Sequence, residues 1–338
     1  MNFINILNHI LRPLEWVVAQ LLTLFHHALV TFGMTAGPSP AWGIAIICLV
    51  LVIRICLLPL FLSQMRAMQR IQVLQPQIQR IQHKYAARKD PRSKEAMQRE
   101  IMALQQRYNA NPLGSCLPSL IQAPILCSLF YTLQSLPAIA DGNAEPLGGI
   151  DHTMAGDIES SSIFGVRIAD SFGTVASPQS RIIIGVAVAL MCLTLFAIQW
   201  MLIHRNTSKD AMVSPQFRVQ KMTVFVFPAI YVVSGATLPF GVLLYWLTNN
   251  LWNLGQTLCQ LRWFPTPGSA AGERKARRDY EQDNRRRAAA GLPSLEEERA
   301  MAAREEAKAR REREKSAASR NRKQHKTPHL AKRSIVKR

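Results

Sequence analysis

Long apolar segments separated by polar stretches dominate the first two-thirds of the chain. Such segments predict membrane-spanning helices, because about 20 apolar residues are needed to cross the hydrocarbon core of a bilayer. Five spans are expected, at about residues 41–62, 113–138, 181–203, 219–235 and 238–261. We therefore expect an all-α polytopic membrane protein with five core transmembrane helices, which together form a core of residues 41–262.

A sixth and less apolar segment, residues 14–32, precedes the five spans. Its polar residues recur at helical spacing, which is typical of an amphipathic helix that lies in the membrane interface. A true span is the alternative, since a segment of this length can cross a locally thinned bilayer. We favour the interfacial helix and assign residues 1–40 to an N-terminal extracytoplasmic or interfacial segment.

The polar stretch at 65–109 predicts two amphipathic helices. Large apolar residues recur every three or four positions in each half of this stretch. The link between the halves ends in Asp90 and Pro91, a typical helix start. Two helices joined by so short a link are expected to pack as an antiparallel hairpin. The Gly-, Ser- and Asp-rich residues 139–180 are expected to form a loop.

The end of the chain, residues 263–338, is polar and strongly basic. Residues 265–338 carry 22 Lys and Arg against 11 Asp and Glu, and the whole chain has a net charge of +19. Because few large apolar residues are present, we expect a disordered basic C-terminal tail. The Glu- and Arg-rich stretch 296–315 is the part of it that could form a helix.

The charges of the connecting segments give one consistent orientation. The stretch 63–112 carries ten basic residues against three acidic ones, whereas the loop 139–180 carries one basic residue and six acidic ones. Basic loops tend to stay in the cytoplasm. The charge pattern therefore predicts a multi-pass protein of the cell membrane with the hairpin, the loop 204–218 and the C-terminus in the cytoplasm, and the acidic loop outside.

One charged residue, Arg54, lies within the apolar span 41–62. An arginine keeps its proton, and its placement near the bilayer centre costs roughly 2.5–3.5 kcal/mol on insertion scales. The five spans contain no Asp or Glu, so no carboxylate within them can pair with Arg54. Snorkelling to the headgroups is the alternative, but the span continues for roughly 12 Å beyond Arg54. We favour a hydrated cavity whose anionic partner comes from outside the protein.

Polar and amphipathic side chains also lie in the other spans: Gln122, Gln199, Tyr245, Trp246, Thr248, Asn249 and Asn250. A single polar residue in a span most often makes a hydrogen bond between helices. Tyrosine and tryptophan are also common at the membrane interface. From the residues alone, each of these side chains is open to two interpretations, as a structural contact or as part of a polar site.

Other chemistry has little support in the sequence. The six cysteines fall nearly all in apolar segments without a CxxC pair, and the eight histidines show no metal-ligand spacing. No nucleotide-binding or hydrolase motif is present. We therefore expect no metal, no cofactor, no small-molecule substrate and no enzymatic activity.

Two stretches of the chain resemble the YidC/Oxa/Alb family of membrane protein insertases. They are IRICLLPLFLSQMRAMQRIQVLQPQIQRIQHKY, followed by NPLGSCLPSLIQAPIL, and the later VFPAIYVVSGATLPFGVLLYWLTNNLWNLGQ. The resemblance covers about residues 41–262 and includes the order and spacing of the spans. The short N-terminal segment is similar to that of the actinobacterial members.

The resemblance implies a hydrophilic groove that opens to the cytoplasm and to lipid and is closed on the outer side. The groove arginine of the family aligns with Arg54. The matching motifs place Gln122 and Gln199 near the groove. Tyr245 and Trp246 match an aromatic pair that is implicated in substrate contact in the family.

The family also implies a role for the cytoplasmic hairpin, which is needed for activity and meets the substrate or the ribosome. Its basic residues are therefore further site candidates: Arg66, Arg70, Arg80 and Lys84. One departure is Val50, which stands where the family usually has a polar residue one turn before the arginine. We expect that side of the groove to be drier.

The function implied is insertion and folding of integral membrane proteins, alone or with the Sec translocon. The partners expected are nascent membrane proteins, with the basic tail contacting ribosomal RNA, anionic lipid or no partner at all. The alternative from another class is an anion channel or small-solute transporter that uses Arg54. Transporters often contain internal repeats, and no repeat is seen.

Overall fold

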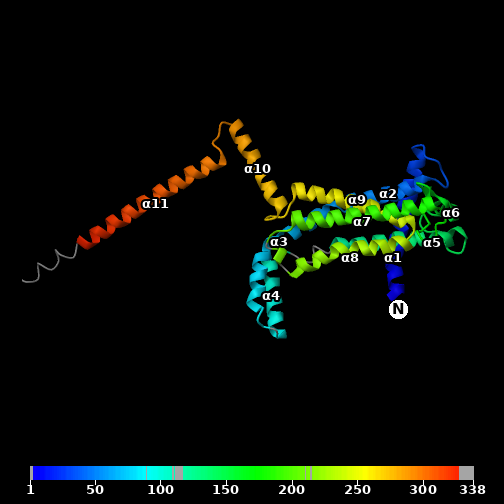
Figure 1. Ribbon diagram of the computed structural model, residues 1–338, viewed down its shortest axis with the longest axis horizontal. Helices are drawn as coiled ribbons and strands as arrows, with labels where there is room; N and C mark the ends of the chain where they lie inside the picture. Colours follow the sequence, from blue (N-terminus) through cyan, green and yellow to red (C-terminus); the bar gives the residue numbers. More distant parts are fainter. Residues whose placement is uncertain are drawn as a thin grey trace, which may run out of the picture. The chain divides into compact units, whose positions relative to one another are not determined.

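The computed structural model describes residues 3–88, 90–108, 110, 117–209, 211–213 and 215–326. The chain divides into two units, residues 1–273 and 274–338. Helices make up nearly all of the first unit (Figure 1). Its long helices are α1 Phe3–Thr31, α2 Pro40–Cys56, α3 Leu58–Tyr85, α4 Pro91–Arg107, α5 Leu117–Ala140, α7 Pro178–Asn206, α8 Pro215–Thr237 and α9 Phe240–Trp263.

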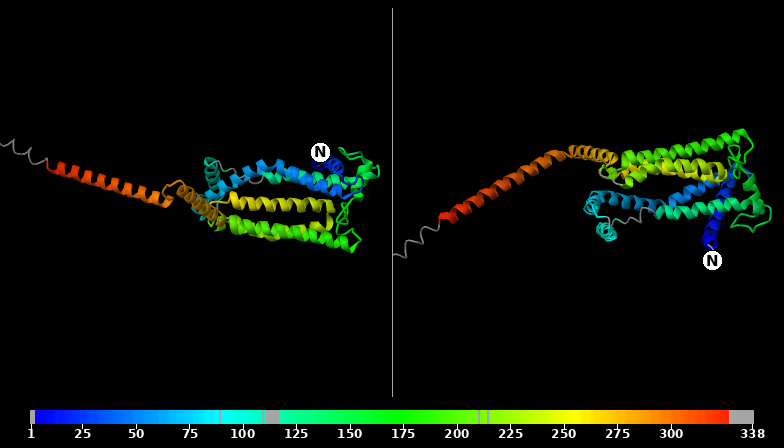
Figure 2. Two further views of the ribbon diagram at one scale, coloured as in Figure 1. Left: turned by 90° about the horizontal axis from the view of Figure 1, so that it is seen from above. Right: turned by 60° about the horizontal axis from the view of Figure 1, so that its bottom comes forward.

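Helices α2, α5, α7, α8 and α9 run side by side and form a bundle (Figures 1 and 2). α7 packs against α8 and α9, and α9 packs against α2. Within the described residues, four helices are long and apolar enough to cross a membrane, namely α1, α5, α7 and α8, and the bent pair α2–α3 passes the same test. The architecture is that of an all-α polytopic membrane protein, as the sequence predicts.

The five expected spans correspond, with shifted ends, to α2 with the start of α3, α5, α7, α8 and α9. α7 is longer than the span expected at 181–203, and α8 and α9 are separated by Leu238 and Pro239 alone. The first residues of the span expected at 113–138 lie outside the described residues, and α5 begins at Leu117. Pro239 directly precedes α9 and has no backbone N–H to donate to α8, so it favours a helix boundary at this point.

The span expected at 41–62 is not one straight helix. It breaks at Leu57, where α2 and α3 meet at an angle of 53°. Pro59 lies in the first turn of α3 and has no backbone N–H to donate to the preceding turn. The bend follows Arg54 by one turn, so Arg54 lies close to the end of α2.

Helix α1 runs across the long axis of the bundle, close to α6 (His152–Ser160) (Figures 1 and 2). It packs against α2 and α5. The buried ring of His26 stacks on the indole of Trp42, with ring centroids 3.8 Å apart. The opposite side of α1 exposes apolar residues, among them Trp16 and Leu24.

Residues 141–177 form a packed cap at one end of the bundle. This cap contains α6 and a short antiparallel ribbon of β1 (Ser162–Ile163) and β2 (Val166–Arg167). The composition of the segment predicts a loop, but it also supplies side chains that are buried in one apolar cluster with residues of α2, α5 and α9: Ile150, Ile158, Ile163, Val166 and Ile168. The local order therefore comes from scattered apolar residues rather than from a regular pattern.

Helices α3 and α4 form a hairpin at the opposite end of the bundle. Leu74 and Ile78 of α3 are buried with Ala110, and Ile101 and Leu104 of α4 pack against them. Asp90 caps α4, since its carboxylate accepts a hydrogen bond of 2.8 Å from the backbone N–H of Ser93. Both helices and the cap agree with the pattern read from the sequence.

As far as it is described, the second unit consists of helices without a packed core. α10 spans Ala270–Ala289 and α11 spans Leu295–Lys326, and residues 327–338 lie outside the described residues. The sequence predicts a helix at 296–315 only, so helical structure is more extensive than expected. Ion pairs at i,i+4 spacing, such as Lys275 with Asp279 and Arg310 with Glu314, support the two helices.

Candidate functional site: a polar cavity around Arg54

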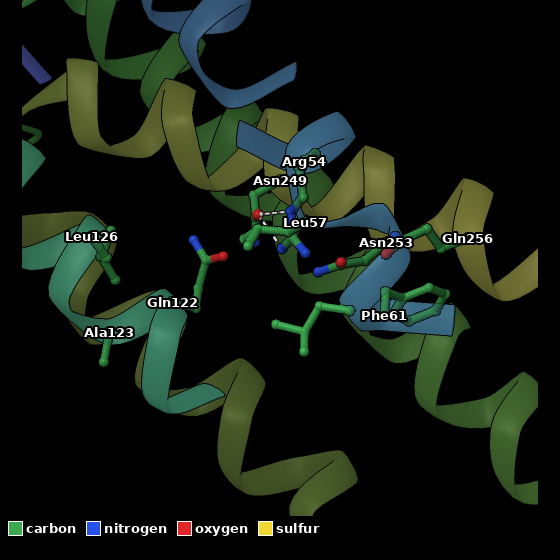
Figure 3. A pocket seen from close by; sticks show the side chains of 10 residues that line it. Arg54, Leu57, Phe61, Gln122, Ala123, Leu126, Asn249, Asn253 and Gln256 are labelled. Carbon is green, nitrogen blue, oxygen red and sulfur yellow. Dashed lines mark hydrogen bonds between the residues drawn. The ribbon is translucent and has the colours of Figure 1, made fainter. Parts of the chain in front are cut away.

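Arg54 reaches from α2 to an asparagine on α9. Its Nε donates a hydrogen bond of 2.8 Å to Oδ1 of Asn249, and a second nitrogen of the guanidinium, Nη2, donates to the same oxygen (Figure 3). In the described part of the chain, Arg54 forms no salt bridge with a carboxylate. The guanidinium has five N–H donors, so the bonds to Asn249 leave most of its capacity for water or a ligand.

A cavity of about 420 Å³ lies beside the guanidinium, between α2, α3, α5 and α9. Gln122 and Asn253 point toward this space from α5 and α9 (Figure 3). We call it the Arg54 cavity, and its lining residues are Arg54, Leu57, Leu60, Phe61, Gln122, Ala123, Leu126, Asn249, Asn253 and Gln256. The polar groups are one cation and four neutral amides, a set that can hold water or an anion.

Helix α9 supplies three of those amides from one face. Asn249, Asn253 and Gln256 are spaced by four and three positions and so lie in a row along the helix. α9 is not among the helices that pass the hydropathy test for a span. The polar row explains this result, because it replaces apolar residues on the face that points into the bundle.

Tyr245 connects α9 to α5. Its hydroxyl accepts a hydrogen bond from Nε2 of Gln122, and its side chain is 2% exposed. The bond holds the amide of Gln122 at the rim of the Arg54 cavity. Of the candidate residues, Arg54 and Gln122 therefore line one polar space, and Tyr245 is bonded to Gln122 without lining that space itself.

Two other candidates lie apart from this space. Trp246 stacks on Tyr231 of α8, with ring centroids 4.9 Å apart, and Gln199 lies on α7. Neither residue lines the Arg54 cavity. Their assignment to the substrate groove stays a prediction.

Sequence reasoning missed Asn253 and Gln256 and treated Asn249 as open to both interpretations. The signal that could have found them is the row itself, since three amides at i, i+4 and i+7 on one membrane helix are costly unless they share a polar environment. A polar residue next to this row does not necessarily line the cavity. Asn250 follows Asn249 directly, but it is 2% exposed and is not among the lining residues.

An apolar layer adjoins the Arg54 cavity on the side of the α6 cap, since Leu126 lines the cavity and packs against this layer. Val50, one turn before Arg54, is 1% exposed and belongs with Leu129, Leu133 and Leu244 to the largest apolar cluster among the described residues. This cluster continues to Trp42 and the cap. The dry side expected at Val50 is therefore part of a continuous apolar core.

The basic candidates of the hairpin are exposed. Arg66, Arg70 and Arg80 lie on α3, and Lys84 forms a salt bridge of 2.9 Å with Glu100 of α4. Hydrogen bonding with Glu100 raises the pKa of Lys84 above its ordinary value. The same bond lowers the pKa of Glu100. No cluster of His, Cys, Asp and Glu that could hold a metal is found among the described residues.

A bundle of apolar helices with an arginine and neutral amides inside it defines the class of the protein, a multi-pass membrane protein with a polar intramembrane site. Comparison with known families then gives the family. The family model described as "60Kd inner membrane protein" matches residues 34–266. The chain belongs to this family, whose relatives include the YidC proteins below.

Two relatives carry the same description. The chain is 44% identical over 306 residues to "Membrane protein insertase YidC" of Bifidobacterium longum, and the match covers 90% of each chain. It is 34% identical over 276 residues to "Membrane protein insertase YidC" of Streptomyces avermitilis, covering 79% of this chain and 61% of the relative. A solved YidC insertase is similar at 22% identity and a TM-score of 0.43, covering 74% of this chain and 46% of that one.

Proposed function

We propose that the protein is a membrane protein insertase and chaperone, which inserts nascent membrane proteins into the cell membrane and helps them to fold. The carrying observation is the Arg54 cavity, in which the described residues surround a cation with neutral amides and supply no carboxylate. A resident acidic partner would neutralise Arg54. Without one, the site is suited to an anionic or polar group that arrives with a client and then leaves.

The mechanism follows from the cost of moving polar groups through hydrocarbon. Each unsatisfied backbone group costs several kcal/mol in the bilayer core. A polar tail that enters the Arg54 cavity exchanges water for the guanidinium and for the amides of Gln122, Asn249 and Asn253. The polar tail then has only the apolar layer around Val50 left to cross. The apolar segment of the client moves into lipid, and its burial drives the step at about 25 cal/mol per Å².

The test is an insertion assay with purified protein in liposomes and two single-span clients that differ only in their tails, one acidic and one neutral. Arg54→Ala is expected to reduce insertion of the acidic client most, and Arg54→Lys to restore part of it. Arg205→Ala, at the end of α7, is the matched control for loss of an exposed arginine. Equal insertion of the acidic client by the wild-type protein and Arg54→Ala would contradict the proposal.

We further propose the orientation that the charges predict, with the α3–α4 hairpin and the C-terminus in the cytoplasm. The acidic segment 139–180 then lies outside, and the Arg54 cavity is on the cytoplasmic side of the apolar layer. The crosswise direction of α1 and its exposed Trp16 and Leu24 support an interfacial helix rather than a span. Labelling of single cysteines at Ser93 and Ser160 with an impermeant thiol reagent tests this orientation, since only the cysteine at Ser160 should react from outside.

Partners beyond the clients are also proposals. The Sec translocon is a partner for clients with large translocated parts. The basic tail, with α10 and α11, has the charge to contact ribosomal RNA or anionic lipid. Co-sedimentation with ribosomes, with and without residues 274–338, distinguishes these possibilities, because equal binding would remove the ribosomal role of the tail. An anion channel or transporter, the alternative function, has no support from the relatives.

A further inference from the structure

A second cleft, of about 560 Å³, lies on the other side of Phe61 and Gln256, and it differs in character from the Arg54 cavity. Phe61 and Gln256 line the cleft as well as the Arg54 cavity and so lie between the two. The cleft runs between α9 and the bend of α2 and α3, and its lining is almost entirely apolar: Leu51, Leu58, Phe61, Leu62, Met65, Thr248, Leu251, Trp252, Gly255, Gln256, Cys259, Gln260 and Phe264.

The length of the cleft corresponds to one leaflet of a bilayer. From Thr248 to Phe264 there are 16 positions along α9, or roughly 24 Å at 1.5 Å per residue. Half of a bilayer with its headgroups is about 20–22 Å thick. Trp263 and Phe264, both exposed at the hairpin end, are residue types that favour the interface. The cleft thus reaches from the interface to the middle of the membrane.

The cleft is too small to enclose a helix. A transmembrane helix 10 Å across and 30 Å long occupies roughly 2,400 Å³, several times the volume of the cleft. A single extended chain of methylene groups is narrow enough. The cleft also falls within the range of roughly 300–1,000 Å³ that is typical of ligand pockets.

The hairpin end of the cleft is basic. Arg66 follows the lining residue Leu62 by one helical turn on α3, and Arg262 follows Cys259 by one turn on α9. Both arginines are exposed. Neither α3 nor α9 contains an Asp or a Glu. A negatively charged headgroup at this position would meet cations from two helices and no acidic residue of either helix.

We propose that this cleft binds one anionic phospholipid, with an acyl chain along α9 and the headgroup phosphate at Arg66 and Arg262. The bound chain packs against Phe61 and so supports the wall of the Arg54 cavity from the lipid side. This site is distinct from the Arg54 cavity and does not depend on the proposed insertase function.

The experiment is a native mass spectrometry titration of the full chain in detergent, with phosphatidylglycerol and phosphatidylcholine of identical acyl chains as probes. Arg66→Gln removes a headgroup contact. Gly255→Phe fills the cleft, and a Cβ at Gly255 meets no atom within 4 Å. The matched controls are Arg205→Gln and Gly185→Phe on α7, since Gly185 also has no atom within 4 Å of an added Cβ.

Wild-type protein is expected to bind phosphatidylglycerol more tightly than phosphatidylcholine. Arg66→Gln should weaken phosphatidylglycerol binding about fivefold, corresponding to about 1 kcal/mol per basic residue at a membrane surface, and leave phosphatidylcholine unchanged. Gly255→Phe should weaken both lipids, and the two controls neither.

Two results would overturn the proposal. One is equal affinity for the two lipids in the wild-type protein, which would indicate ordinary solvation by lipid. The other is an equal loss of binding in the control variants. If Gly255→Phe does not fold, Cys259→Trp fills the same cleft from an exposed position, and the same outcomes apply. Displacement of the lipid by an apolar client peptide that binds in its place would also reject the lipid as occupant.

Discussion

The two ends of the bundle differ in how the same helices, α2 and α9, pack. One end is an apolar core, and the other encloses a polar cavity. At the α6 end, side chains from α1, α2, α9 and the cap form one apolar cluster. The first backbone N–H groups of α9 are satisfied there, since Phe240 donates to the carbonyl of Asp170 at 2.7 Å and Gly241 to that of Ile168 at 2.9 Å. Toward the hairpin end, the same α2 and α9 line the Arg54 cavity, where Arg54 bonds to the amide of Asn249 and to no carboxylate of the described residues.

This difference shows how one pair of helices can be held rigidly at one end and keep a polar cavity for a ligand at the other. The packed end holds the helices in register, which allows the other end to keep a polar cavity without collapse. A site that holds an incompletely paired cation is destabilising in itself. We therefore expect substitutions at the α6 end to affect stability, and substitutions around Arg54 to affect function more than stability.

The largest loss of stability is expected for Trp42→Ala. Trp42 is 1% exposed, belongs to the apolar cluster and stacks on His26. Its truncation should cost about 3–5 kcal/mol, as for other buried tryptophans. Thermal unfolding in detergent measures the effect. Trp200→Ala is the control, because Trp200 is 53% exposed; an equal decrease for both variants would show that the α6 end is not the stabilising region.

A smaller loss is expected for Gly148→Ala, where the cap touches α1. Gly148 has a φ of +59°, and a Cβ there would lie 2.9 Å from the carbonyl oxygen of Trp16 and 3.0 Å from Cβ of Ala19. Backbone strain and the close contact together should cost about 1–3 kcal/mol. Gly142→Ala isolates the backbone part, because Gly142 also has a positive φ but no atom within 4 Å. If both variants unfold at the same temperature, the close approach of cap and helix contributes nothing.

Arg54→Leu is expected to separate stability from function. It removes the partly satisfied cation, so the unfolding temperature should rise. Insertion of a client with an acidic tail should fall about tenfold, which corresponds to about 1.4 kcal/mol, a part of the attraction of about 4 kcal/mol between opposite charges 4 Å apart at an effective dielectric constant of 20. Parallel melting and insertion measurements test both. A decrease in both would mean that Arg54 is a structural residue.

The sequence predicted regular features well and irregular ones poorly. Helical periodicity predicts the α3–α4 hairpin, Asp90 is predicted as the N-cap of α4, and the cost of a charge in lipid points to Arg54. The bend at Leu57 was not expected, because an apolar span gives no sign of where its axis turns, although Pro59 was visible. The α6 cap is predicted to be a loop, because apolar residues such as Ile163 and Ile168 recur at no fixed spacing along the sequence. They share an apolar environment only in the folded chain. The row of Asn249, Asn253 and Gln256 on α9 is visible in the sequence only when the three residues are considered together as one face of a helix.

The smallest effect is expected at the hairpin, through the ion pair of Lys84 and Glu100. The pair raises the pKa of Lys84 above its ordinary value of 10.5 and lowers that of Glu100 below 4.5. Its contribution is therefore present between these values, is lost as the pH falls through the lowered pKa of Glu100, and is lost as the pH rises through the raised pKa of Lys84. Both groups are exposed, so Lys84→Met should lower the unfolding temperature only slightly at pH 7. At a pH below the lowered pKa of Glu100 the variant and the wild-type protein should unfold together, and a difference that persists there would assign the effect to the packing of the Lys84 stem rather than to its charge.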